Sequence, residues 1–238
     1  VLLVCLDPWL HTPTDVLLSQ LPLMDLMLIR ITVPKTAFNY LSGSKSISVA
    51  GCGAQIFFYM SLLGAECFLL ASMAYDRYVA ICHPLRYSVL MSQKTCCLMA
   101  ASSWILGSTD GIIDVAMVLS FSYCGVREIP NFFCDVPALL TLSCTRTLLF
   151  ERIMFICCVV MLLLPVAVII ASYARVILAV IRMGSGESRH KAFTTCSSHL
   201  IVVGMYYGAG MFIYMRPVSD RSPTQDKMVS AFYTILTP

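Results

Sequence analysis

The sequence alternates long apolar segments with short polar ones, a pattern typical of helices that cross a membrane. A transmembrane helix needs about 20 mostly apolar residues to span the hydrocarbon core of a bilayer. Three segments meet this requirement easily: 49–75, 153–174 and 192–215. The segment 96–119 also meets it, although Asp110 and Asp114 lie in its last turns.

The weakest candidate span is 16–38, which carries Pro22, Asp25 and Arg30. Residues 1–6 are too few to cross a bilayer and are expected to be the end of a helix. We predict an all-α membrane protein with five complete spans, preceded by a stub and followed by half of a last helix. The expected elements are a stub at 1–6, helices at 14–38, 49–78, 95–119, 152–180 and 191–215, the start of a helix at 227–238, and a polar loop at 120–151.

The composition supports a lipid environment. Of the 238 residues, 58% are hydrophobic and 12% are charged, with a mean hydropathy of +0.82. A soluble domain has about 25% charged residues, and one globular core could hardly bury so much apolar surface. The net charge of +3 is scattered along the chain, without the basic cluster that a nucleic-acid partner would require.

The twelve cysteines fall into two groups. Most lie inside apolar segments, where cysteine behaves as a small hydrophobic residue. The sequence has no CxxC pair, and His190, Cys196 and His199 do not share one helical face. It therefore gives no indication of a metal site. Four others lie in or beside polar segments: Cys52, Cys124, Cys134 and Cys144.

The orientation in the membrane follows from these cysteines rather than from basic residues. Lys and Arg number seven on the side that contains the 76–94 loop and eight on the other side, so their distribution does not decide. A loop with three cysteines, 120–151, suits the oxidising exterior. The 76–94 loop is therefore expected in the cytosol.

The end of the 49–75 segment carries the most specific motif, "MAYDRYVAICHPLRY" at 73–87. Asp76 and Arg77 stand side by side where the apolar run stops. By itself such a pair could simply mark a helix end, because charges at the membrane boundary reach headgroups and water. The surrounding residues favour a more specific interpretation.

This motif, together with "SYARVIL" at 172–178 and "KAFTTCSSH" at 191–199, resembles the odorant (olfactory) receptors. These form a branch of the rhodopsin-like, class A G-protein-coupled receptors. The resemblance extends from "LHTP" at 10–13 to "TILTP" at 234–238. It implies a seven-transmembrane-helix receptor bundle in which helix 1 is mostly missing and helix 7 is cut short.

The resemblance implies a switch at the cytosolic end of helix 3. Arg77 would pair with Asp76 at rest and move toward Tyr173 of helix 5 on activation, opening a crevice for a G protein. An ion pair at a low-dielectric boundary is stronger than one in water, so breaking it can separate two states. The expected switch residues are Asp76, Arg77, Tyr78, Tyr173, His199 and Tyr207.

Two acids are expected near the middle of the bilayer. Glu66 precedes Arg77 by about 16 Å of helix, and Asp25 lies at a similar depth in helix 2. Facing carboxylates repel, so either one is protonated or a cation lies between them. The resemblance points to a sodium ion that favours the inactive state, and the alternative is two independently hydrogen-bonded, protonated acids.

Four loop cysteines allow three disulfide connectivities, which the sequence does not distinguish. The resemblance implies that Cys52 pairs with Cys134 and that Cys124 pairs with Cys144. The first bond would hold the 120–151 loop over the bundle as a lid. Free thiols are the alternative for a chain that stays in a reducing compartment.

The expected ligand pocket lies under this lid, between helices 3, 5 and 6. Its residues should form an apolar, adaptable cavity suited to a small hydrophobic odorant, with no acid to anchor an amine. The resemblance adds that Tyr207 holds the toggle position of helix 6. The candidate residues are Tyr59, Met60, Leu63, Gly64, Cys157, Cys158, Met161, Tyr207, Gly210, Met211 and Tyr214.

Some positions depart from the family pattern. Thr14, Asp15 and Val16 stand where relatives usually read Met-Tyr-Phe, and Pro22 stands where they usually have serine. A non-signalling fragment, held in the endoplasmic reticulum and able to pair with intact receptors, is therefore an alternative. An ion-linked transporter using Asp25 and Glu66 is a further one, although no inverted repeat is visible.

We therefore expect an odorant receptor of the plasma membrane that signals through a stimulatory G protein to adenylyl cyclase. Its expected partners are an odorant, that G protein, membrane lipid and a second receptor copy, with no nucleic acid. Sodium is the one expected ion. No nucleophile, base and orienting residue are spaced for catalysis, so we expect no enzyme.

Overall fold

The computed structural model describes residues 13–42, 47–123, 134, 136–140, 142–144, 148–182 and 186–214. Their regular structure is helical, apart from a single antiparallel bridge between Tyr123 and Ser143. The all-α fold class is thus confirmed. The long helices are α2 (Pro13–Ser42), α3 (Val49–Cys82), α5 (Gln93–Leu119), α7 (Leu148–Cys158), α8 (Leu164–Arg182) and α9 (Gly186–Tyr214).

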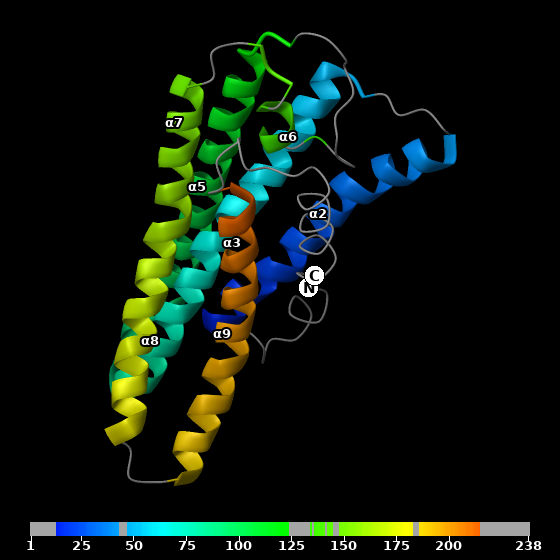
Figure 1. The fold of residues 1–238 in the computed structure, drawn as a ribbon. Coiled ribbons are helices and arrows are strands. Elements are labelled where there is room, and N and C mark those ends of the chain that lie inside the picture. Colours follow the sequence, from blue (N-terminus) through cyan, green and yellow to red (C-terminus); the bar gives the residue numbers. More distant parts are fainter. Residues whose placement is uncertain are drawn as a thin grey trace.

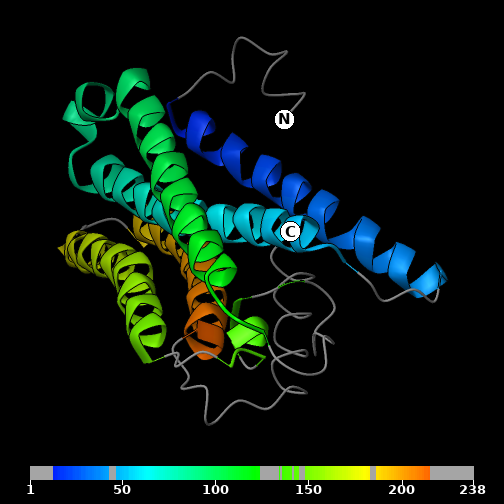
Figure 2. The same cartoon turned by 90° about the horizontal axis from the view of Figure 1, so that it is seen from above.

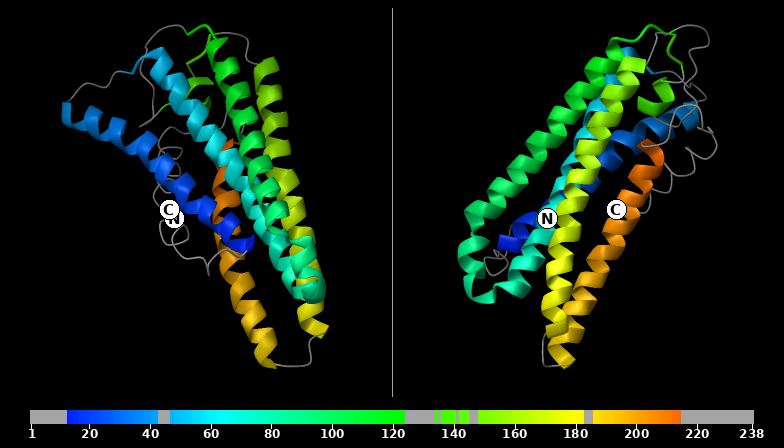
Figure 3. Two further views of the ribbon diagram at one scale, coloured as in Figure 1. Left: turned by 180° about the vertical axis from the view of Figure 1, so that it is seen from behind. Right: turned by 60° about the vertical axis from the view of Figure 1, so that its left-hand side comes forward.

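Helix α3 runs through the centre of the described bundle and contacts α2, α5, α8 and α9 (Figure 1). Seen from above, α2 lies on one side of α3, and α8 and α9 lie on the other (Figure 2). We call the end of the bundle that carries Asp76 the inner end and the end that carries Cys52 the outer end. The C-terminal part of α2 diverges from the bundle, and α8 and α9 extend past α3 at the inner end (Figure 3).

The limits of α3 follow from local chemistry. Ser48 caps its N-terminus, because the Ser48 hydroxyl accepts a hydrogen bond from the Gly51 amide at 3.1 Å. The helix ends at Cys82, since Pro84 cannot donate a backbone hydrogen bond and disfavours helical geometry at His83. A short 3-10 turn (Pro84–Arg86) and a four-residue helix, α4 (Tyr87–Leu90), then lead to α5.

Two glycines allow α3 and α5 to approach closely. A side chain at Gly107 would collide with the Ser61 carbonyl and the Ala65 amide, and one at Gly111 would collide with the Ser61 hydroxyl. The spacing of four residues places both glycines on one face of α5. Small residues at this spacing are a common basis for helix packing in membranes.

The fifth span is continuous but irregular. Helices α7 and α8 are joined by a π-helical segment, Val159–Leu163, which ends just before Pro165. Proline has no amide hydrogen for the carbonyl four residues earlier, and a π-turn is one way to accommodate that loss. The irregular segment places Met161 and Leu162 toward α3 and α9.

Among the described residues, three helical segments are long and apolar enough to cross a membrane: Val49–Cys82, Gln93–Leu119 and Phe155–Arg182. The sequence analysis expected five spans. Helices α2 and α9 have 30 and 29 residues, and the side chains of parts of both lie outside the description, so these two spans stay predictions.

Several helix limits also differ from those expected. The fifth span, which comprises α7, the π-helical segment and α8, begins at Leu148 and ends at Arg182. Helix 6, which is α9, begins at Gly186, and α3 extends to Cys82. The 120–151 segment is not wholly a loop, because it contains α6 (Val136–Leu140) and the first turn of α7. The expected stub at 1–6 and the helix start at 227–238 lie outside the described residues.

Candidate functional site

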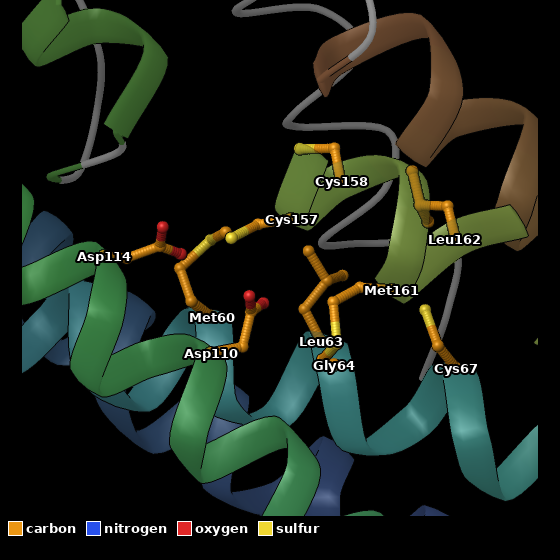
Figure 4. Close-up of a pocket in the computed structure, with 10 residues that line it drawn as sticks. All are labelled: Met60, Leu63, Gly64, Cys67, Asp110, Asp114, Cys157, Cys158, Met161 and Leu162. Carbon is orange, nitrogen blue, oxygen red and sulfur yellow. The ribbon is translucent and has the colours of Figure 1, made fainter. Parts of the chain in front are cut away.

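A small cavity lies between α3, α5 and the fifth span, toward the outer half of the bundle (Figure 4). Its volume is about 30 Å³, which is space for one or two water molecules. Flexible thioether and thiol side chains make up much of its wall. It is lined by Met60, Leu63, Gly64, Cys67, Asp110, Asp114, Cys157, Cys158, Met161 and Leu162.

Six of these ten residues were expected from the sequence: Met60, Leu63, Gly64, Cys157, Cys158 and Met161. Other expected pocket residues lie elsewhere in the described structure. Tyr59, Tyr207, Gly210 and Met211 do not line this cavity, and the side chain of Tyr214 lies outside the description. None of the described side chains of helix 6 (α9) lines the cavity, and α5 takes the place of this helix in the wall.

The contribution of α5 changes the chemistry of the cavity. Asp110 and Asp114 both line it, whereas the ligand pocket was expected to contain no acid. Asp114 is only 1% exposed, and the Asp110 carboxylate lies 3.6 Å from where a Cβ on Gly64 would be. The sequence signal was available, because acids in an apolar span usually face the interior of a bundle.

Gly64 and Met161 set the size of the cavity. A Cβ at Gly64 would lie 2.8 Å from the Met161 terminal methyl group and 3.1 Å from the Gly107 Cα. Because Gly64 has no side chain, α3, α5 and the fifth span can approach one another at this point. An organic ligand would have to displace the Met60 and Met161 side chains, which are flexible enough to repack.

The outer end of α3 is held by a disulfide between Cys52 and Cys134, with 5.4 Å between their Cα atoms. This is the pairing that the resemblance implied. The Cys134 amide also donates to the Gln55 side-chain oxygen at 3.1 Å. Cys144 is disulfide-bonded as well, and its expected partner Cys124 lies outside the described residues.

Helix α9 is tied to α3 by two neighbouring tyrosines. Tyr206 donates its hydroxyl hydrogen to the Leu63 carbonyl at 2.7 Å, and Tyr207 donates to the Cys67 carbonyl at 2.8 Å. Both acceptors belong to residues that line the cavity. A shift of α3 at the cavity would therefore act directly on helix 6.

A second hydrogen bond joins α9 to α8 closer to the inner end. The Tyr173 hydroxyl lies 2.7 Å from the His199 Nδ1. The positive charge of Arg77 acts on both of these residues. The structure therefore brings Tyr173 and His199 of the expected group into contact, within the influence of the Arg77 charge.

The expected pairing of Asp76 with Arg77 was wrong. Asp76 is 1% exposed and accepts a 2.8 Å hydrogen bond from the Tyr87 hydroxyl. The Thr14 hydroxyl lies 3.3 Å from the second carboxylate oxygen and 2.7 Å from the Tyr87 hydroxyl. No ion pair joins Asp76 to Arg77 within the described residues, because consecutive residues of a helix point about 100° apart.

Tyr87 and Tyr78 connect this region to the loop that follows α3. Partial burial is the main cause that raises the pKa of Tyr87, and its hydrogen bond to Asp76 adds to the effect. The Tyr78 hydroxyl lies 3.1 Å from the His83 Nε2, and Tyr78 also packs against the hydrophobic cluster that contains Tyr173. Asp76 and Tyr78 thus fix the loop geometry, while Arg77 faces α8 and α9.

The two acids of the expected sodium site lie on adjoining helices. Glu66 in α3 is 5% exposed, and Asp25 in α2 is half-buried. Neither lines the α3–α5 cavity. Within the part of the chain that is described, no group of three or more His, Cys, Asp or Glu side chains could hold a metal ion.

Comparisons with known proteins identify the family. A family model described as "Olfactory receptor" matches residues 1–238. The human "Olfactory receptor 2M3" and "Olfactory receptor 2M5" are 76% and 74% identical to the chain over 238 residues, which are 100% of this chain and 76% of each relative. The mouse "Olfactory receptor 2V1" is 59% identical with the same coverage. The chain therefore belongs to the olfactory receptor family of class A G-protein-coupled receptors, a family of membrane receptors and not of enzymes.

Proposed function

We propose that this chain binds small volatile organic molecules in the α3–α5 cavity and signals through a stimulatory heterotrimeric G protein to adenylyl cyclase. The observation that carries the proposal is the link between cavity and helix 6. Leu63 and Cys67 line the cavity and also accept the hydrogen bonds of Tyr206 and Tyr207. A ligand that moves this part of α3 alters the two contacts that hold α9 in place.

The inner end supplies the second half of the mechanism. Helix α9 also carries His199, which is hydrogen-bonded to Tyr173 of α8 near the charge of Arg77. A displacement of α9 would separate His199 from Tyr173 and free the Tyr173 hydroxyl for Arg77. The inner ends of α8 and α9 would then part, which opens a crevice for the G protein.

The Asp76 network has a different part in this mechanism. Its hydrogen bonds to Thr14 and Tyr87 join α2, α3 and α4 without involving Arg77. Activation therefore does not require an Asp76–Arg77 pair to break. The network instead keeps the loop after α3 in a fixed position while α8 and α9 move.

We also propose that Asp25 and Glu66 bind a sodium ion that stabilises the inactive state. Carboxylate oxygens suit a hard cation, and the two acids lie on adjoining helices at a depth where ionised groups are costly. Sodium chloride should raise the thermal unfolding temperature of the purified chain above its value in choline chloride. Glu66→Gln should remove that difference, and an unchanged difference would contradict the site.

Surface labelling combined with a cyclic-AMP readout tests the proposed function. Tagged cells should carry the chain on the plasma membrane and should produce cyclic AMP when exposed to members of a broad odorant panel. Tyr173→Phe removes the hydroxyl that contacts His199 and would bond Arg77 on activation, so it should reduce the maximal response without reducing surface labelling. A surface-exposed chain that never raises cyclic AMP would contradict coupling to a stimulatory G protein.

A further inference from the structure

The geometry points to a specific ligand class: the α3–α5 cavity binds a small aliphatic amine in its protonated form, with the ammonium group between Asp110 and Asp114. This inference rests on the proposed function, because it names the ligand class of the same cavity. It concerns the two acids that α5 contributes, not the sodium site on α2 and α3.

The first argument is the charge of the cavity wall. Two of the ten lining residues are acids, and the other eight are apolar or sulfur-containing, with no Lys, Arg or His among them. Asp110 makes neither a hydrogen bond nor an ion pair to any residue of the described part of the chain. In Figure 4 its carboxylate points into the space beside Met60 and Leu63. The described residues around the cavity thus supply no positive charge for this carboxylate.

The second argument is electrostatic. Asp110 and Asp114 are four residues apart on α5, so they lie on the same face of that helix. Carboxylates in a low-dielectric interior are costly to ionise, and two of them on one face repel. A single positive charge between them offsets both effects. A neutral alcohol or ketone of the same size could accept or donate a hydrogen bond but could not compensate the charge.

The third argument is the shape and composition of the remaining wall. The acids lie at one side, while Cys157, Cys158 and Met161 of the fifth span form the other. This division suits a ligand with a compact charged head and a short apolar tail. An alkylamine has that structure and is protonated at pH 7, since its pKa is about 10 like that of lysine.

The test compares hexylamine with 1-hexanol, which has the same carbon skeleton and no charge. Cells carrying the tagged chain are labelled at the surface, and cyclic AMP is measured over a concentration series of each compound. The variants are Asp110→Asn and Asp114→Asn, which keep the side-chain shape. Asp15→Asn is the matched control, because it makes the same change at an acid that does not line the cavity.

Hexylamine should be at least about tenfold more potent than 1-hexanol on the unmodified chain and on the Asp15→Asn control. Each cavity variant should lose about tenfold or more in potency toward hexylamine and change by less than about twofold toward 1-hexanol. Equal potency of the two compounds on the unmodified chain would overturn the inference. An equal loss toward both compounds in the cavity variants would also overturn it.

A binding measurement separates this inference from the proposed function. Hexylamine at constant sodium chloride should raise the thermal unfolding temperature of the purified chain, and Asp110→Asn should abolish the rise while Glu66→Gln retains it. If this rise occurs but cells give no cyclic AMP, the proposed function fails and the inference stands. If other odorants raise cyclic AMP but hexylamine gives no rise in unfolding temperature, the inference fails alone. A further outcome is that added sodium chloride alone raises the unfolding temperature by the same amount, with the rise lost in Asp110→Asn. That result would mean that the cavity acids bind sodium and not an amine, and it would overturn the inference.

Discussion

Asp76 and Asp110 are both acids on transmembrane helices, yet their surroundings differ. Asp76 at the inner end is surrounded by hydroxyl donors, since Thr14 and Tyr87 both bond its carboxylate. Asp110 in the cavity makes no hydrogen bond within the described part of the chain and faces sulfur and apolar side chains. The comparison indicates that the first acid stabilises the fold and that the second is available to a ligand.

The largest expected effect concerns the stability of the inner end. Asp76→Ala leaves the Thr14 and Tyr87 hydroxyls without their acceptor and should reduce the free energy of unfolding by about 2 to 3 kcal/mol. Asp110→Ala should not destabilise the chain, because it removes a buried acid that has no such donors. Thermal unfolding of both variants in detergent provides the measurement. Equal destabilisation would contradict the distinction between the two acids.

An intermediate effect is expected at the link between the cavity and helix 6. Tyr207→Phe removes the hydrogen bond to the Cys67 carbonyl and should weaken the α3–α9 contact by about 1 kcal/mol. In the proposed mechanism this contact holds α9 in the inactive position, so basal cyclic AMP should rise by up to about fivefold. Tyr123→Phe is the matched control, because the Tyr123 hydroxyl also donates to a backbone carbonyl, that of Val118, which belongs to neither α3 nor α9. A similar basal rise in both variants would argue against the link.

The smallest expected effect concerns Tyr87 and pH. Because the pKa of Tyr87 is raised above its ordinary value of 10.0, folding favours its protonated form. Its contribution to stability is therefore complete below that value and is lost as the pH rises above it. Tyr87→Phe should cost about 1 kcal/mol at pH 7 and should reduce the alkaline loss of stability. Thermal unfolding at pH 7 and at an alkaline pH measures both effects, and an unchanged alkaline loss would contradict this role of Tyr87.

The sequence predicted the helical class and six residues of the cavity because helical spacing places them on one face of each span. It missed Asp110 and Asp114, although both acids were visible at the end of the 96–119 segment. Periodicity within one helix does not reveal which neighbour it faces. That information lay in Gly107 and Gly111, whose missing side chains bring α5 against α3 beside the cavity.

The switch was predicted less completely, for a related reason. Adjacent charges suggested an Asp76–Arg77 pair, but neighbours on a helix point in different directions. Asp76 faces α2 and α4, whereas Arg77 acts on Tyr173 and His199 of α8 and α9. Thr14 was noted as a departure from relatives, and its hydrogen bond to Asp76 requires the tertiary contact between α2 and α3. Such contacts depend on how helices pack and have no signature in a single segment.

The most direct test of the account fills the cavity. Met161 contacts the open face of Gly64, so Met161→Trp should occupy the space between α3, α5 and the fifth span. Cyclic AMP is measured in surface-labelled cells against the compounds that activate the unmodified chain. The account predicts that Met161→Trp reaches the surface and loses its response to all of them, and an undiminished response would contradict the assignment of this cavity as the ligand site.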